Sequence, residues 1–376
     1  MRRIRGVLLR IAIPLHGLGH IGRGAESWAK DLAYALARHN VDVILFKGGG
    51  VEESKIERVV PCIKRNSIIL GGRESRISWD RRTNIEKNSF ALFLVPHILV
   101  DDFDIWHISS LYFSLKYLKL TRLINQKLIY TCHGYVDPRG IPQWLDAITQ
   151  PAPFYVKKAQ EMNIDTKKWF LLPNFVDSNL FNPQNKPIRD QLGIPKDSFV
   201  VLSVGAITKR VKRMDYVIRE FSKISKQANT FLLIVGEEED ETPWIRNLGK
   251  KLAGSRIKFL SNIPHEKMPN IYASCDVFVL ASLEEFFGIV FLEAMSSGKP
   301  VIGAAHPVTK WIIGEGGENI DMRIEGNLAA TLKKYLSDIS LREKKGKLAR
   351  TRTEKLFSLE ENVKRVVEIY KRVLEI

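Results

Sequence analysis

Two glutamates near the end of the chain, Glu285 and Glu293, are separated by seven residues that include Gly288. The apolar run at residues 276–282 has the pattern of a strand that ends just before them. Apolar residues then recur at helical spacing over 290–295, so the segment is predicted to be a strand, a loop and a helix. Two carboxylates are thereby placed at the start of a helix, where ligand chemistry is common.

The loop would open onto a helix N-terminus, where backbone N–H groups lack partners and the helix dipole is positive. The amides of Phe287, Gly288 and Ile289 are therefore a candidate seat for a phosphate. Glu293 could accept two hydrogen bonds from a vicinal diol such as a ribose, while Glu285 would face the group beyond the phosphates. Such a site suits a nucleotide sugar. The alternative is that both glutamates are ordinary solvated charges.

A basic loop follows the predicted strand at residues 199–204 and includes Lys209, Arg210 and Lys212. Cations at the carboxyl end of a strand could neutralise the charge that develops on a leaving diphosphate. Lys212 is the first choice for this role. The alternative is a solvated loop.

The first predicted strand, residues 7–14, runs into a glycine-rich loop that opens a helix at residues 25–39. Its glycine spacing differs from a dinucleotide fingerprint, and the second strand ends in Lys47 rather than an acidic residue, which argues against a nicotinamide cofactor. His16 and His20 in this loop stand four residues apart, but we find no third metal ligand and interpret them as loop histidines. The sequence therefore predicts no metal site.

His133 directly follows the predicted strand at residues 127–132 and precedes Gly134. A side chain at the carboxyl end of a parallel strand points toward the ligand edge of the sheet. Its ring could polarise or hydrogen-bond a sugar hydroxyl beside the reacting carbon. A structural histidine remains the alternative.

Strand-like and helix-like segments alternate along the chain, which predicts parallel sheets built from βαβ units. Residues 180–197 are rich in Pro, Asn and Asp and interrupt the pattern like an interdomain linker. We therefore predict an α/β protein with two Rossmann-like, doubly wound domains facing a cleft that holds the active site. Beyond the segments already named, strands are expected at 41–46, 105–108, 230–235, 257–260 and 300–303, and a helix at 110–125.

The composition is that of a globular protein, with 376 residues and a formal charge of +16. The region from Lys55 to Lys87 is enriched in basic residues, but no nucleic-acid-binding motif accompanies them. Peripheral contact with an anionic membrane is therefore the preferred hypothesis over nucleic acid. No apolar run is long enough to span a bilayer, and the three unpatterned cysteines fit a cytoplasmic protein.

Taken together, these motifs resemble the retaining glycosyltransferases of family 4, which have the two-Rossmann GT-B fold. The tail Glu-Ala-Met-Ser-Ser-Gly-Lys-Pro-Val at 293–301 is the most specific match. Gly24-Ala25-Glu26, His133-Gly134 and residues 172–177 resemble further family motifs. The resemblance covers nearly the whole chain.

The resemblance implies that Glu293 holds the ribose, that the amides after Glu285 and Lys212 hold the diphosphate, and that Glu285 and His133 touch the donor sugar. Gly24, Lys209 and Arg210 are assigned to donor binding on the same grounds. It further implies hexosyl transfer from a UDP-, GDP- or ADP-sugar to a glycan, lipid-linked or small-molecule acceptor, with retention and no obligate cofactor. The expected domains are 1–180 on the acceptor side and 181–358 on the nucleotide-sugar side, with a final helix at 359–376 crossing back to the first.

Four positions depart from the family pattern: Arg23, Ala206, Phe286 and the pair His306-Pro307. Ala206 stands where the family has a phosphate-binding arginine, for which Lys209 or Arg210 would have to substitute. A nucleotide-sugar epimerase, a glycoside phosphorylase or a non-catalytic nucleotide-sugar-binding protein on the same fold are the alternatives.

Overall fold

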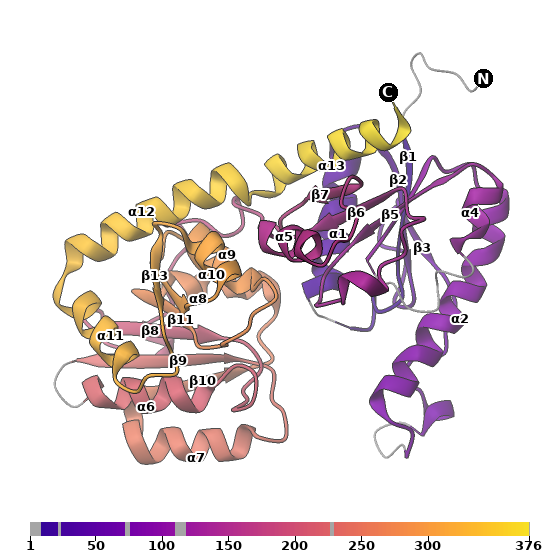
Figure 1. The fold of residues 1–376 in the computed structure, drawn as a ribbon. Coiled ribbons are helices and arrows are strands. Elements are labelled where there is room, and N and C mark those ends of the chain that lie inside the picture. Colours follow the sequence, from indigo (N-terminus) through magenta and orange to yellow (C-terminus); the bar gives the residue numbers. More distant parts are fainter. Residues whose placement is uncertain (1–8, 22–23, 72–75, 110–117, 226–228, 376) are drawn as a thin grey trace. The chain divides into compact units, whose positions relative to one another are not determined.

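The computed structural model describes residues 9–21, 24–71, 76–109, 118–225 and 229–375. The chain forms two compact units (Figure 1). The first contains Met1–Pro173 together with Asn362–Ile376, and the second contains Asn174–Glu361. Each unit is a parallel sheet with helices packed on it, which confirms the predicted α/β class.

The first unit contains a seven-stranded parallel sheet in the order β3-β2-β1-β4-β5-β6-β7. The strands are β1 (Arg10–Leu15), β2 (Asp42–Lys47), β3 (Glu57–Val59), β4 (Ile105–Ile108), β5 (Lys127–Thr131), β6 (Ala147–Gln150) and β7 (Trp169–Leu171). The order reverses at β1 and β4, both of which are apolar and buried, as expected for strands covered on both faces. Such a switch point places the carboxyl ends of β1 and β4 beside one another.

The helices of the first unit are α1 (Gly24–Arg38), α2 (Trp79–Val100), α4 (Leu120–Leu123), α5 (Pro153–Glu161) and α13 (Leu359–Leu374). Helix α1 buries Trp28, Leu32 and Leu36 at i, i+4 and i+8, so one apolar stripe faces the sheet. Glu26 in its first turn and Arg38 in its last complement the helix dipole.

The second unit contains a six-stranded parallel sheet in the order β10-β9-β8-β11-β12-β13. Its strands are β8 (Phe199–Val204), β9 (Thr230–Gly236), β10 (Ile257–Ser261), β11 (Val277–Leu280), β12 (Val301–Ala304) and β13 (Gly317–Ile320). The order again reverses at β8 and β11. The loops that follow these two strands carry Lys212 and Glu285, so the switch point brings the two predicted site segments together.

The helices of the second unit are α6 (Met214–Ser225), α7 (Thr242–Ala253), α8 (Met268–Ala273), α9 (Ile289–Ser296), α10 (Pro307–Ile313), α11 (Asn327–Ser337) and α12 (Ile339–Leu356). Helices α6 and α7 lie together on one side of the sheet, and α8, α9 and α10 lie on the other (Figure 1). Met214, Val217 and Phe221 of α6 pack on the sheet in a continuous apolar core. This packing fixes the loop before α6, which carries Lys212.

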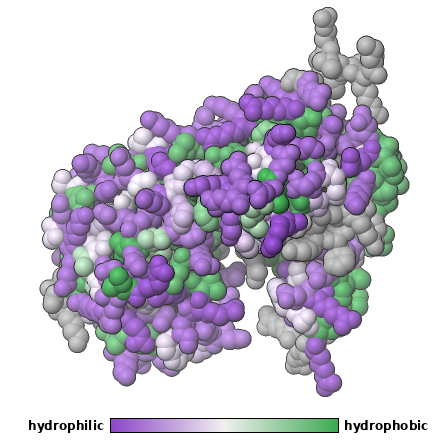
Figure 2. Space-filling model, viewed as in Figure 1, coloured by the Kyte–Doolittle hydropathy of each residue, from purple (hydrophilic) through white to green (hydrophobic). Residues whose placement is uncertain are grey.

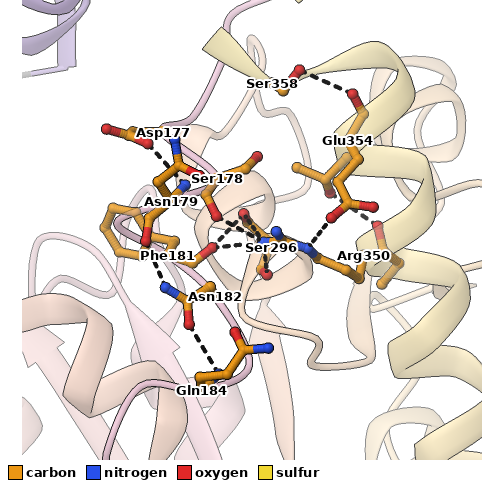
Figure 3. Close-up of polar contacts among 12 residues, drawn as sticks. Asp177, Ser178, Asn179, Phe181, Asn182, Gln184, Ser296, Arg350, Glu354 and Ser358 are labelled. Carbon is orange, nitrogen blue, oxygen red and sulfur yellow. Dashed lines mark hydrogen bonds and ion pairs between the residues drawn. The ribbon is translucent and has the colours of Figure 1, made fainter. Parts of the chain in front are cut away.

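The segment predicted to be a linker, residues 180–197, packs on the second unit. Arg350 Nη1 donates hydrogen bonds to the carbonyl oxygens of Ser178, Phe181 and Ser296 at 3.1, 2.9 and 2.7 Å (Figure 3). Further along, Ile188 N–H donates to Ser274 Oγ at 2.8 Å. One arginine thus ties the chain entering the second unit to the C-terminus of α9, and the unit begins at Asn174 rather than residue 181.

The predicted strands all form, with ends shifted by up to three residues. Strands β3, β6, β7 and β13 were not predicted. The helix expected at 110–125 falls partly on residues 110–117, which lie outside the described residues, and α4 covers Leu120–Leu123. In the described part of the chain no helix is both long and apolar enough to cross a membrane.

Candidate functional site

Lys212 and Glu285, from loops 73 positions apart in sequence, form an ion pair in the second unit. Lys212 Nζ lies 2.7 Å from Glu285 Oε2, and both side chains are largely buried. The lysine stem crosses Gly205 directly after β8, where a Cβ atom on residue 205 would lie 3.2 Å from Lys212 Cγ and Cδ. Gly205 also has a φ of +150°, so a glycine suits this position for both reasons. The strand end and the glycine together aim the ammonium group at the loop before α9.

Helix α9 begins at Ile289, and its N-cap Gly288 has a φ of +81°, which lies in the left-handed region. A Cβ there would lie 2.9 Å from Phe291 Cδ2 and 3.0 Å from Glu285 Cγ, so a larger residue would disturb the loop. Among the described residues, no acceptor meets the N–H groups of Gly288, Ile289 and Val290, as is usual at a helix start. These donors and the positive end of the helix dipole can receive an anion.

Phe287 is buried and anchors the loop rather than facing a ligand with its side chain. Its ring makes edge contacts with Trp311 and Phe357 at centroid distances of 6.4 and 6.1 Å. The ring therefore holds the backbone at the start of α9 in place.

Glu293, one and a half turns into α9, is buried and hydrogen-bonded through both oxygens. Tyr272 OH donates to Oε2 at 2.5 Å, and His265 Nε2 lies 3.1 Å from Oε1. Complete burial, followed by the charge of Glu293, raises the pKa of Tyr272, which therefore stays a donor. A carboxylate has about four acceptor positions, so two remain for a ligand. The alternative of a surface glutamate is excluded, since Glu293 is 6% exposed.

Tyr272 and His265 were missed by the sequence reasoning. They lie on α8 and in the short turn before it, 21 and 28 positions from Glu293. The His265 ring also packs against Phe181 at a centroid distance of 5.3 Å. No motif surrounds either residue, so only the packing of α8 on α9 reveals them.

Lys209 and Arg210 lie in the same loop as Lys212 but hydrogen-bond to Glu241 through their backbone. Their backbone N–H groups donate to Glu241 Oε2 at 2.7 and 3.2 Å. Lys209 Nζ lies 5.3 Å from the centre of the Trp244 ring, over α7. Among the described residues neither side chain contacts Lys212, Glu285 or Glu293, so their donor-binding role remains a prediction.

His306 and Pro307, a departure from the family pattern, form the start of α10. His306 Nδ1 accepts from Val308 N–H at 3.3 Å, and Thr309 Oγ1 accepts from His306 N–H at 3.3 Å. The pair therefore acts as a capping box with proline in the first turn. The adjacent cavity of about 180 Å³ is lined by residues that include Leu283, Glu284 and His306. With His306 and Pro307 at this position, a cavity is therefore present beside the loop that carries Glu285.

In the first unit, β5 ends at Thr131, one residue earlier than predicted, so His133 lies two residues beyond the strand. Its ring meets the Trp28 ring of α1 edge-on at a centroid distance of 4.4 Å. Gly24 is the first residue of α1, while Arg23 lies outside the described residues. The histidine and the first turn of α1 therefore belong to neighbouring elements at the ligand edge of this sheet.

The two loop histidines, His16 and His20, have different surroundings. His16 is buried, and burial lowers its pKa to about 3. His20 Nε2 is hydrogen-bonded to the buried Glu86, which also pairs with Arg65. In the part of the chain that the structure describes, no group of three potential ligand residues is placed to hold a metal.

Comparison with known proteins finds similarity to one family in the second unit. Residues 184–352 match the family model "Glycosyl transferases group 1", and they contain Lys212, Glu285 and Glu293. This part of the chain is similar to the group 1 glycosyltransferases.

The chain is similar to an uncharacterised glycosyltransferase, MJ1607, of Methanocaldococcus jannaschii, with 28% identity over 210 residues. That match covers 53% of this chain and 51% of the relative, so the chain spans about half the length of this curated relative.

Two solved structures share the fold of almost the whole chain. Sucrose-phosphate synthase from Thermosynechococcus elongatus superposes with a TM-score of 0.81 at 20% identity, covering 98% of this chain and 99% of that one. Anabaena HepE in complex with UDP-glucose superposes with a TM-score of 0.73 at 17% identity, covering 98% of each chain. These likenesses confirm the predicted pair of Rossmann-like domains.

Proposed function

We propose that the protein is a glycosyltransferase that moves a hexose from a nucleoside diphosphate sugar to an acceptor with retention of configuration. The observation that carries the proposal is the ion pair between Lys212 and Glu285, which lies just before α9. The same helix carries the buried Glu293. Lys212 and the backbone N–H groups at the start of α9 can bind a diphosphate, and Glu293 can accept hydrogen bonds from the ribose next to it.

In this proposal the amides of Gly288 and Ile289 and the ammonium group of Lys212 bind the diphosphate. Their positive charge stabilises the leaving group as the sugar–phosphate bond loosens. The Glu285 carboxylate holds Lys212 before the donor arrives and then faces the donor sugar. Glu293 accepts the ribose hydroxyls through the two acceptor positions that Tyr272 and His265 leave open.

From the sequence we further propose that His133 touches the donor sugar and that Gly24 takes part in donor binding. HepE, whose fold this chain shares, is in complex with UDP-glucose, which supports a uridine donor here. No obligate cofactor is proposed. The acceptor is a glycan, a small molecule or a lipid-linked sugar, and the last of these would bring the enzyme to a membrane at the cytoplasmic face.

Donor binding by variants tests the assignment. We expect Lys212→Ala and Glu293→Ala each to weaken UDP-glucose binding about 10- to 100-fold, because each removes charge-assisted hydrogen bonds. Isothermal titration with UDP-, GDP- and ADP-glucose measures the change and identifies the base. Lys250→Ala, at an exposed lysine of α7, is the matched control and should bind like the parent protein.

Unchanged affinity of both variants for all three donors would overturn the site assignment. Release of free nucleotide diphosphate and glucose from the donor would separate an enzyme from a binding protein, since a binding protein retains the donor intact.

A further inference from the structure

Helix α2 carries apolar side chains on two opposite sides. One side is buried in the first unit and contains Phe90, Leu94 and Ile98. The other is exposed and consists of Leu92, Phe93, Pro96, Leu99 and Val100, which recur at i, i+1, i+4, i+7 and i+8. Its large members are 49 to 82% exposed. Figure 2 shows green, apolar surface along the part of the first unit that carries α2. We call these five residues the outer face of α2.

The apolar surface continues beyond the outer face. Ile63, itself exposed, donates its N–H to Ser89 Oγ at 2.9 Å, one turn before Leu92. The same loop carries Ile68 and Ile69, which are 93% and 83% exposed. Leu123 is also exposed on α4, which packs against α2. These side chains come from three neighbouring segments of one unit, so the surface is not a scatter of single apolar residues.

Such a surface requires an explanation. Exposed apolar side chains forgo the stabilisation that burial would give, and contiguous exposed patches on soluble proteins mark interaction sites. Of the large apolar side chains that are exposed in the described part of the chain, ten fall between Val59 and Leu123. The concentration in one stretch of the chain indicates a docking surface.

The charge around this surface favours an anionic partner. Residues 55–87 contain nine basic and four acidic residues. Among the described residues of 59–102, the exposed basic residues are Lys64, Arg76 and Arg81. The exposed acidic residues there are Asp80 and Asp102. A basic, apolar surface complements a layer of anionic headgroups over a hydrocarbon interior.

A tryptophan sits among these cations at the first residue of α2. The guanidinium carbons of Arg65 and Arg82 both lie 5.4 Å from the centre of the half-exposed Trp79 ring. Arg65 is fixed from below by its ion pair with the fully buried Glu86. An indole flanked by cations is the side-chain combination that favours the interface between water and lipid.

We propose that the outer face of α2, with Ile63, Ile68 and Ile69, docks peripherally on an anionic lipid bilayer. This goes beyond donor binding and gives the membrane contact of the proposed function a defined surface. The apolar side chains enter the headgroup region, and Lys64, Arg76 and Arg81 meet the lipid phosphates and carboxylates. The docked first unit would then take acceptors directly from the membrane surface.

Co-sedimentation of the full chain with vesicles tests the proposal. We expect binding to vesicles of 30 mol% phosphatidylglycerol in phosphatidylcholine at low salt, and weak binding to phosphatidylcholine alone. Phe93→Ser/Val100→Ser should lower the partition coefficient about tenfold or more, because two inserted side chains are lost. Ile324→Ser/Ile339→Ser, at two exposed isoleucines of the second unit, is the matched control and should bind like the parent protein.

A second variant tests the charges. Lys64→Gln/Arg81→Gln should weaken binding to the anionic vesicles several-fold and reduce its salt dependence. Equal sedimentation of the Phe93→Ser/Val100→Ser variant and the parent would overturn the proposal. The proposal would also be overturned if the parent protein did not bind vesicles and light scattering showed a dimer for the parent but a monomer for this variant. The surface would then join two copies of the chain.

Donor affinity, measured on the same samples, separates the two proposals. A variant that loses vesicles but keeps UDP-glucose supports the surface independently of the donor site. Loss of both vesicle binding and UDP-glucose binding would indicate a folding defect, which melting curves of each variant detect. In that case the Lys64→Gln/Arg81→Gln variant provides the test of the surface.

Discussion

At the scale of single residues, the candidate site shows what sequence spacing can and cannot predict. The seven-residue interval between Glu285 and Glu293 places both carboxylates at one loop and helix, because local geometry fixes where they lie. The partners Tyr272 and His265 come from α8 and the turn before it, so only the tertiary packing of α8 against α9 brings them to Glu293. Lys212 was predicted because its basic loop follows a strand. Its contact with Glu285 depends on the neighbouring positions of β8 and β11.

Tyr272→Phe should weaken UDP-glucose binding about three- to tenfold and lower the free energy of unfolding by about 1–3 kcal/mol. The change removes the hydroxyl that donates to Glu293 Oε2 and leaves a buried carboxylate with fewer hydrogen bonds. Calorimetric titration and urea unfolding measure the two effects.

Tyr335→Phe is the matched control for this substitution. Tyr335 is also a buried tyrosine of the second unit, but its hydroxyl meets no hydrogen-bond partner among the described residues. Its loss should leave donor affinity unchanged. If the two variants behaved alike, Tyr272 would have no special role at Glu293.

At the scale of elements, the start of α9 depends on the backbone of Gly288. Gly288→Ala should destabilise the protein by about 1–2 kcal/mol and weaken donor binding, because a φ of +81° disfavours alanine and the new methyl group meets Phe291 and Glu285. Thermal unfolding with and without UDP-glucose measures both effects.

Gly326→Ala separates the backbone conformation from the lack of space. Gly326 precedes α11 with a φ of +90°, and a Cβ there would meet nothing within 4 Å. This control should lose some stability but no donor affinity. Equal loss of donor affinity in both variants would contradict a local role for Gly288.

The elements themselves were predictable where the apolar pattern is long. Strands β4 and β8 have the predicted bounds, since largely apolar runs between turn residues favour buried parallel strands. Strands β3 and β7 contain three residues each, too few to show a period. Strand β13, Gly-Glu-Asn-Ile, has a composition that disfavours a strand, and its pairing with β12 overrides that preference.

At the scale of the whole molecule, the first unit is built from two distant parts of the chain. Tyr370 of α13 is buried, and its hydroxyl lies 2.7 Å from His107 Nδ1 on β4. His107 Nε2 lies 2.5 Å from Thr131 Oγ1, which in turn is 2.7 Å from Thr149 Oγ1. This buried polar chain links β4, β5, β6 and the C-terminal helix, so the helix is part of the core of the first unit.

Acid should destabilise the first unit through this chain. Burial, with a smaller contribution from His133, lowers the pKa of His107 to about 3, against about 6.5 when unfolded. As pH falls from about 6.5 to about 3, His107 is protonated in the unfolded chain but stays neutral in the folded protein. The free energy of unfolding therefore decreases by up to about 1.4 kcal/mol per pH unit. Above pH 6.5 this contribution is constant.

Urea unfolding at a series of pH values measures the slope. His107→Gln should reduce it, while the buried His16, whose pKa is also about 3, keeps part of it. His39→Gln, at an exposed histidine after α1, is the control and should leave the slope unchanged. An unaltered slope in His107→Gln would show that His107 does not titrate as its burial indicates.

The discontinuity of the first unit also sets the order in which a nascent chain can mature on the ribosome. Residues 174–361 are contiguous, so the domain that they form can complete its core as soon as they emerge. The first unit cannot complete its core until the segment that carries Tyr370 has been synthesised. Until the second unit has been translated, His107 therefore lacks its contact with Tyr370. A chaperone that shields β4 during this interval would therefore act on the part of the protein that was synthesised first.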